Sequence, residues 1–160
     1  MFKTKAILAL LVLPALALPM QAAAKDRPPL KGSETGTFRL LGPCEGGMLL
    51  EVTGTGHTTE LGSYSARYRE CFDPATGAVT GGTFTLTAAN GDKVFGTFAG
   101  QASPTDDPNV IRYDDPGVIT GGTGRFARAG GTVSTSGLAN MATGEYRGTI
   151  TGSVSRPVSG

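Results

Sequence analysis

The sequence has little of what metal sites and helical domains need. It contains one histidine and two cysteines, and two cysteines 27 positions apart with one histidine make a poor zinc ligand set. The histidine, His57, falls in a glycine-threonine segment without an acidic neighbour. We interpret it as a solvated loop residue rather than a general base. We expect no metal ion and no cofactor.

Charge is also scarce and balanced. Charged residues make up 17% of the chain. Without Lys3 and Lys5, the 14 basic residues become 12 against 13 acidic ones, a net charge of about −1. The chain has no basic block that would favour nucleic acid or an anionic lipid surface. We therefore expect neither as a partner.

Residues 1–24 have the form of a secretory signal peptide. Lys3 and Lys5 precede an apolar run from Ala6 to Leu18, and three alanines end at Ala24. The run of 13 residues is shorter than the ~20 that a membrane-spanning helix needs, so cleavage is favoured over a membrane anchor. The mature chain is expected to begin near Lys25, to be secreted or periplasmic, and to have no contact with a membrane.

The two cysteines, Cys44 and Cys71, are expected to form a disulfide bond, because an exported chain matures in an oxidising compartment.

The rest of the chain shows strand periodicity instead of helical periodicity. Residues 83–88 place Phe84, Leu86 and Ala88 on one face and threonines on the other, the alternation of a strand with one buried face. No apolar spacing of i, i+3, i+4, i+7 continues beyond two turns. Residues 25–34, with two prolines and scattered charges, are expected to be a flexible leader before a domain that spans 35–158.

Turn signals divide this domain into eight expected strands. Asn90-Gly91 is a strong hairpin signal, and glycine ends the expected turns at 73–77 and 142–144. The expected strands are 35–41, 47–55, 60–72, 78–89, 92–101, 109–120, 130–138 and 144–155. Their short links are typical of a sandwich or a barrel, and we favour an all-β, eight-stranded antiparallel up-and-down β-barrel. In such a meander Cys44 and Cys71 lie at the same end of the sheet, as a disulfide requires.

One glycine-rich segment resembles a known family. Residues 119–131, Ile-Thr-Gly-Gly-Thr-Gly-Arg-Phe-Ala-Arg-Ala-Gly-Gly, resemble the I-x-G-G-T-G-x-F-x-x-A-x-G segment of plant dirigent proteins. They are also similar to the corresponding segment of allene oxide cyclases. Gly121, Gly122 and Gly124 would permit a tight crossing between two strands, and Phe126 would close the barrel end against the core. A phosphate-binding loop is disfavoured, because no helical pattern follows and the lysine with its serine or threonine is missing.

The resemblance implies an eight-stranded barrel with a mostly apolar cavity, often assembled as a trimer. Members of this superfamily guide the cyclisation or stereoselective coupling of small hydrophobic molecules, with help from a few polar cavity residues. The resemblance places the glycine motif in this sequence and carries over no catalytic residue.

Candidate ligand-binding residues come from strand parity. Tyr64, Tyr68, Glu70 and Tyr146 each share a parity with apolar neighbours. Pointing inward, they would line an apolar cavity, where burial would raise the pKa of the carboxyl. The alternative is that the tyrosines pack in the core and Glu70 reaches solvent.

Two acidic pairs are interpreted as turns. Asp106-Asp107 and Asp114-Asp115 each precede proline, and neither has the ligand spacing of a calcium loop.

Three functions are compatible with these sequence features. An exported barrel that binds a small hydrophobic molecule in its cavity, without assigned chemistry, is the favoured hypothesis. A cyclase or isomerase of the allene oxide cyclase kind, using the cavity tyrosines or Glu70, is the second. A structural envelope protein with a filled barrel is the third. Cavity volume separates the third from the others, because an eight-stranded barrel can be filled or hollow.

Overall fold

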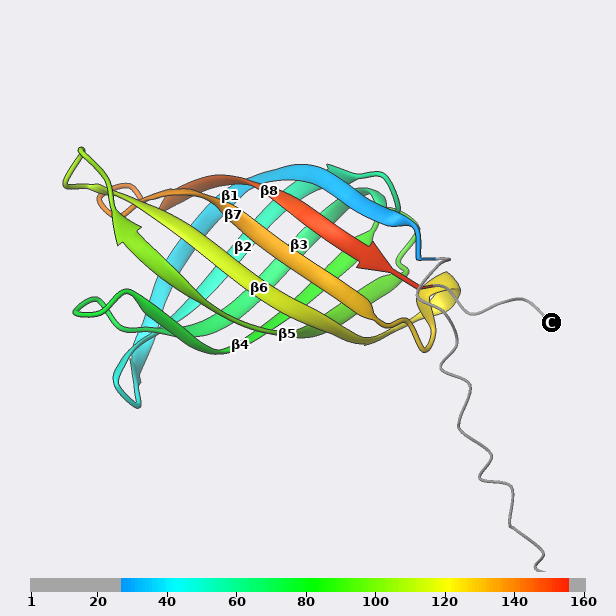
Figure 1. Cartoon of the computed structure of the whole chain (residues 1–160), viewed down its shortest axis with the longest axis horizontal. Coiled ribbons are helices and arrows are strands. Elements are labelled where there is room, and N and C mark those ends of the chain that lie inside the picture. Colours follow the sequence, from blue (N-terminus) through cyan, green and yellow to red (C-terminus); the bar gives the residue numbers. More distant parts are fainter. Residues whose placement is uncertain (1–26, 156–160) are drawn as a thin grey trace, which may run out of the picture.

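The computed structural model describes residues 27–155, so the expected signal peptide and residues 25–26 lie outside the described part. Eight strands and one short 3-10 helix account for almost all of it (Figure 1). The elements are β1 (Pro29–Cys44), β2 (Gly47–Thr58), β3 (Gly62–Phe72), β4 (Ala78–Ala88), β5 (Lys93–Pro104), β6 (Val110–Gly122), η2 (Gly124–Phe126), β7 (Gly131–Asn140) and β8 (Glu145–Val154).

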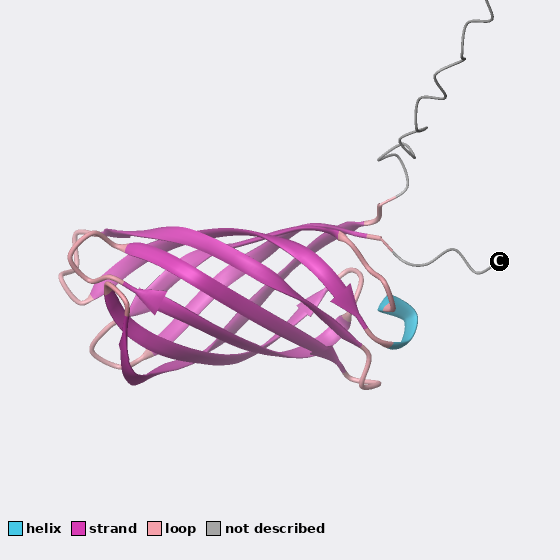
Figure 2. Ribbon diagram, turned by 90° about the horizontal axis from the view of Figure 1, so that it is seen from below, coloured by secondary structure: helices cyan, strands magenta, loops and turns pink. Residues whose placement is uncertain are grey.

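The strands form a closed barrel in which each strand pairs with its neighbours in the sequence. Every pairing is antiparallel, and β1 closes the sheet by pairing with β8 from Pro29↔Ser153 to Thr37↔Glu145. Figure 2 shows the tilted strands wrapping around a single interior. The predicted eight-stranded antiparallel up-and-down β-barrel is therefore confirmed, and closure leaves no unpaired sheet edge.

Alternation along the strands decides what lies inside. Phe84, Leu86 and Ala88 are buried in the core as their spacing predicts, and on β5 Val94 and Phe98 face inward. Glycines on neighbouring strands make room for large rings. A Cβ atom placed on Gly82 would lie 2.7 Å from the Phe98 ring. The many glycines of this sequence thus serve the small-and-large alternation that fills a narrow barrel.

The prediction that residues 25–34 form a flexible leader is wrong from Pro29 onward. Pro29 begins β1, and Leu30 is completely buried. Leu30, Gly32 and Glu34 take the inward positions of the strand that closes the barrel. The alternation is concealed in the sequence because a glycine and a carboxylate stand where a strand normally places apolar side chains.

Two further interpretations need correction. His57 lies on β2 rather than in a turn, although it is exposed there. Asp114 and Asp115 lie within β6, whereas the Asp106-Asp107 pair does lie in the connection between β5 and β6. The β5–β6 register passes from Phe98↔Gly117 to Gln101↔Asp114 and skips Pro116, which pairs with β7 instead. A proline is tolerated in a strand where no ladder hydrogen bond is required of it.

The two ends of the barrel differ. The end that carries η2 lies at the right of Figure 1 and is closed by Phe126, which is completely buried in the core. Gly124 has a φ of +57° there, a left-handed conformation that favours glycine. The connections β1–β2, β3–β4, β5–β6 and β7–β8 lie at the opposite end, which we call the mouth.

The Cys44–Cys71 disulfide forms at the mouth, as predicted. It joins the last residue of β1 to the end of β3 across β2, with 6.0 Å between the two Cα atoms. The bond fixes the rim of the barrel on the side where β1 and β3 carry inward carboxyl groups.

Replacing both cysteines by serine should lower the free energy of unfolding by roughly 3–4 kcal/mol, because a loop of this length is no longer restrained in the unfolded chain. Urea unfolding of the double variant and of the reduced wild-type protein measures this loss. The two should agree, and an unfolding free energy equal to that of the oxidised wild type would contradict a stabilising role for the bond.

Candidate functional site

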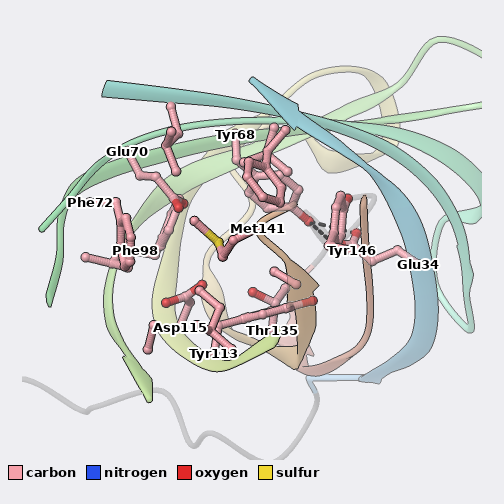
Figure 3. A pocket seen from close by; sticks show the side chains of 17 residues that line it. Glu34, Tyr68, Glu70, Phe72, Phe98, Tyr113, Asp115, Thr135, Met141 and Tyr146 are labelled. Atoms are coloured by element: carbon pink, nitrogen blue, oxygen red, sulfur yellow. Dashed lines mark hydrogen bonds between the residues drawn. The ribbon is translucent and has the colours of Figure 1, made fainter. Parts of the chain in front are cut away.

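A cavity of about 70 Å³ lies inside the barrel on the side of the mouth (Figure 3). Met141, in the β7–β8 connection, lines the cavity and is 38% exposed, so the cavity reaches the surface at this end. The apolar lining residues near the mouth form what we call the collar: Phe38, Leu50, Phe72, Val79, Ile111 and Met141. The polar lining residues come from β1, β3, β6, β7 and β8. Glu70 lies beside Leu50 of the collar, and Glu34 lies farther from the mouth.

Glu34 is the most thoroughly partnered of the polar groups. It points inward from β1 and is only 4% exposed. The Tyr68 hydroxyl donates to both of its carboxylate oxygens, at 2.8 and 2.9 Å, and the Tyr64 hydroxyl donates to Oε2 at 2.8 Å. Burial raises the pKa of Glu34 above its ordinary value, and these hydroxyl donors oppose the rise. Burial next to this carboxylate also raises the pKa of both tyrosines.

Glu70 and Asp115 form a second acidic region of the same cavity. Glu70 lies opposite Leu50 on β2, and Asp115 lies opposite Thr135 on β7. Burial, with a smaller contribution from the charge of Asp115, raises the pKa of Glu70 to about 8. Burial, with a smaller contribution from Asp114, raises the pKa of Asp115 to about 7. No lysine, arginine or histidine is among the described residues that line the cavity, so these carboxyl groups face no compensating positive charge.

Three buried side-chain atoms lack a hydrogen-bond partner within residues 27–155. They are the hydroxyl oxygens of Tyr113 and Tyr146 and Oδ1 of Asp115. All three residues line the cavity. The Tyr146 hydroxyl lies close enough to Glu34 to affect its pKa but does not form a well-aligned hydrogen bond. An unpartnered buried polar atom costs stability and is uncommon in folded proteins. All three such atoms therefore belong to residues of a single cavity.

The structure places three of the four candidate ligand-binding residues, Tyr68, Glu70 and Tyr146, in the cavity lining. Tyr64 does not line the cavity, but its hydroxyl donates a hydrogen bond to Glu34, which does. Gly121, Gly122, Gly124 and Phe126 belong to the closed end and do not line the cavity.

Sequence reasoning missed four polar residues of the site: Glu34, Tyr113, Asp115 and Thr135. Glu34 was assigned to the leader and Asp115 to a turn. The signal that would have found Asp115 is its parity with Gly117 and Ile119, since Ile119 is a core residue of the same strand. A proline between them hid this alternation.

Comparison with protein-family models and with curated proteins finds no match to this chain. Within the described residues, no three histidine, cysteine, aspartate or glutamate side chains are grouped so that they could hold a metal ion. The same residues include no helix that is long and apolar enough to cross a membrane.

The raised carboxyl pKa values predict that stability falls as pH rises. The folded protein holds the protons of Glu70 and Asp115 more tightly than the unfolded chain, in which these groups titrate near pH 4. Their destabilising effect is therefore small near pH 4, grows as pH rises, and levels off about one unit above the pKa of about 8 of Glu70. The free energy of unfolding should be lower at pH 8.5 than at pH 5 by roughly 2–4 kcal/mol.

Urea unfolding at the two pH values measures this difference, and Glu70→Gln should reduce it. Glu145→Gln, at an exposed position on β8, serves as the matched control and should leave it unchanged. A wild-type protein that is equally stable at both pH values would contradict the destabilising role of the buried carboxyl groups.

Proposed function

We propose that the barrel binds a small, largely apolar molecule that enters through the mouth and places a polar group among Glu70, Asp115 and Tyr146. The observation that carries this proposal is the set of unpartnered buried polar atoms around a space that the protein leaves unfilled. Ligand sites are commonly apolar cavities with a few convergent polar groups. The collar and the polar lining residues have this arrangement.

The cavity is small, and its size limits the ligand. A cavity of about 150 Å³ is sufficient for benzene, and the volume here is about half of that. A ligand of a few heavy atoms fits, or the head of a longer molecule whose tail extends through the collar. The unfilled space and its polar lining favour binding over a purely structural role. In a purely structural barrel, unpartnered buried polar atoms would only lower stability.

The proposed setting is the periplasm or the extracellular space. A disulfide at the barrel rim supports an oxidising compartment, and residues 1–24 have the pattern of a signal peptide. The relationship to the dirigent and allene oxide cyclase superfamily, and the trimer that it implies, remain part of the proposal and rest on the glycine motif.

Filling the cavity should abolish binding. Ala102 and Ala99 both lie on β5, but Ala102 lines the cavity and Ala99 faces outward. Native mass spectrometry of protein purified without denaturation should detect a bound small molecule on the wild type and on Ala99→Leu. Ala102→Leu should carry none, because its larger side chain occupies the space. A bound mass that persists on Ala102→Leu would place the ligand elsewhere and contradict the proposal.

A second function, acid–base isomerisation of the bound molecule, is favoured by one observation. The pKa of Asp115 is about 7 and that of Glu70 about 8, so both groups can exchange protons near neutral pH. If the barrel is an isomerase, Glu70→Gln should abolish conversion of the bound molecule while leaving its binding intact, as judged by mass and chromatographic retention. Conversion at the wild-type rate in both Glu70→Gln and Tyr68→Phe would exclude these residues as the acid–base groups. Absence of conversion by the wild type would leave binding as the function.

A further inference from the structure

We infer that the ligand of this cavity is a small organic cation, a short alkylammonium ion whose charged head lies between Glu70 and Asp115 and whose apolar tail lies in the collar. This inference rests on the proposed binding function and names the chemical class of its ligand.

Charge complementarity is the first reason. Glu34, Glu70 and Asp115 all line the cavity, and none of the described lining residues is basic. A molecule that enters this space replaces water around the carboxyl groups, which makes their interaction with its charge stronger than in solution. A cation gains from this interaction, and a carboxylate ligand is repelled. A neutral ligand leaves the acidic groups without a counter-charge.

Hydrogen bonding is the second and independent reason. Asp115 is 8% exposed, and its Oδ1 atom has no partner among residues 27–155. Its carboxyl lies over Gly100 of β5, where any side chain would collide with Oδ1. The carboxylate of Glu34 already accepts hydrogen bonds from two tyrosines, whereas Asp115 has an acceptor left over. A primary ammonium group carries three donors and no acceptor, so it matches a site in which acceptors are in excess.

The aromatic side chains of the cavity add to the fit. Tyr68 and Phe98 meet edge to face with 5.9 Å between ring centroids, and Tyr113 and Tyr146 meet in the same way at 6.4 Å. All four rings line the cavity. Aromatic faces attract cations, most strongly where water is excluded.

The size and grouping of the site favour an organic ion over a metal ion. The carboxyl groups surround a common space but do not come together as a metal-binding group among residues 27–155. An alkylammonium ion has a compact head that fits the cavity and a tail that matches Leu50, Phe72 and Met141 at the mouth.

The pH dependence of binding follows from the groups around the head. Titratable lining residues come from four strands: Glu34 on β1, Tyr68 and Glu70 on β3, Tyr113 and Asp115 on β6, and Tyr146 on β8. The lining residues from β2, β4, β5 and β7 do not titrate. The tyrosines stay neutral because burial raises their pKa. Affinity for a cation should therefore rise with pH as Asp115 and Glu70 lose their protons.

The test uses n-butylammonium, 1-butanol and butyrate, which share a four-carbon chain and differ in charge. Binding to the full mature protein is measured by isothermal titration calorimetry and by NMR shift changes at pH 6 and pH 8.5. We expect the affinity for n-butylammonium at pH 8.5 to exceed that for 1-butanol about tenfold or more, which corresponds to the strength of one charge-assisted hydrogen bond. We expect this preference to shrink at pH 6, and butyrate not to bind.

Asp115→Asn should weaken n-butylammonium binding about tenfold and leave 1-butanol binding nearly unchanged. Asp114→Asn, at the exposed neighbouring position, is the matched control. It should stay close to the wild type at pH 8.5, where Asp115 is ionised with or without the charge of Asp114. Glu70→Gln provides a second variant if Asp115→Asn does not fold, and the wild-type pH profile requires no variant.

The outcomes separate the two proposals. If 1-butanol binds as tightly as n-butylammonium and Ala102→Leu abolishes both, the cavity binds apolar molecules and the cation inference is wrong. If none of the three probes binds and the purified protein carries no small molecule, both the inference and the proposed function fail.

Discussion

Closure of eight antiparallel strands places every second side chain of each strand in one narrow interior. Glu34 on β1 and Asp115 on β6 take such inward positions and are only 4% and 8% exposed, so they can meet solvent only through the cavity. Strands with one buried face normally place apolar side chains at such positions. The chain instead has carboxyl groups there, which lose hydration on folding and can be tolerated only with hydrogen-bond partners or as neutral acids.

The protein treats these carboxyl groups in two different ways. Glu34 is held by the hydroxyls of Tyr64 and Tyr68, and this network lies deep in the barrel, where it orders the interior. Asp115 and Glu70 lie nearer the mouth and have pKa values of about 7 and 8. Glu34 lines the same cavity but already accepts hydrogen bonds from two hydroxyls, whereas Oδ1 of Asp115 has no partner among residues 27–155. The difference between Glu34, which has hydroxyl donors, and the pair Glu70 and Asp115, whose pKa values lie near neutral pH, underlies both the proposed binding and the proposed ligand class.

Much of the fold could be predicted from the sequence, because alternation and turn chemistry are local signals. Phe84, Leu86 and Ala88 on β4, and the hairpin turn at Asn90-Gly91, are examples whose neighbours in the sequence are enough to place them. The disulfide followed from the order of strands. The first half of β1 could not be found in this way, because Gly32 and Glu34 are inward for reasons that only other strands supply. Gly32 lies against the backbone of His57 on β2, and Glu34 faces Tyr64 and Tyr68 on β3.

The candidate site was predictable in part for the same reason. Tyr68, Glu70 and Tyr146 lie on strands with clear alternation. Asp115, in contrast, precedes a proline, and an Asp-Pro sequence is typical of a turn. The pKa of each carboxyl also depends on its burial by other strands, which no local pattern encodes. The most direct test of the buried acidic cavity is an NMR titration of the glutamate and aspartate side-chain carboxyl carbons in the ligand-free protein. We predict that Glu70 titrates at about pH 8 and Asp115 at about pH 7, and that n-butylammonium lowers both values. Titration of both groups near pH 4 would show that the cavity carboxyls are hydrated like surface groups and would contradict their proposed role.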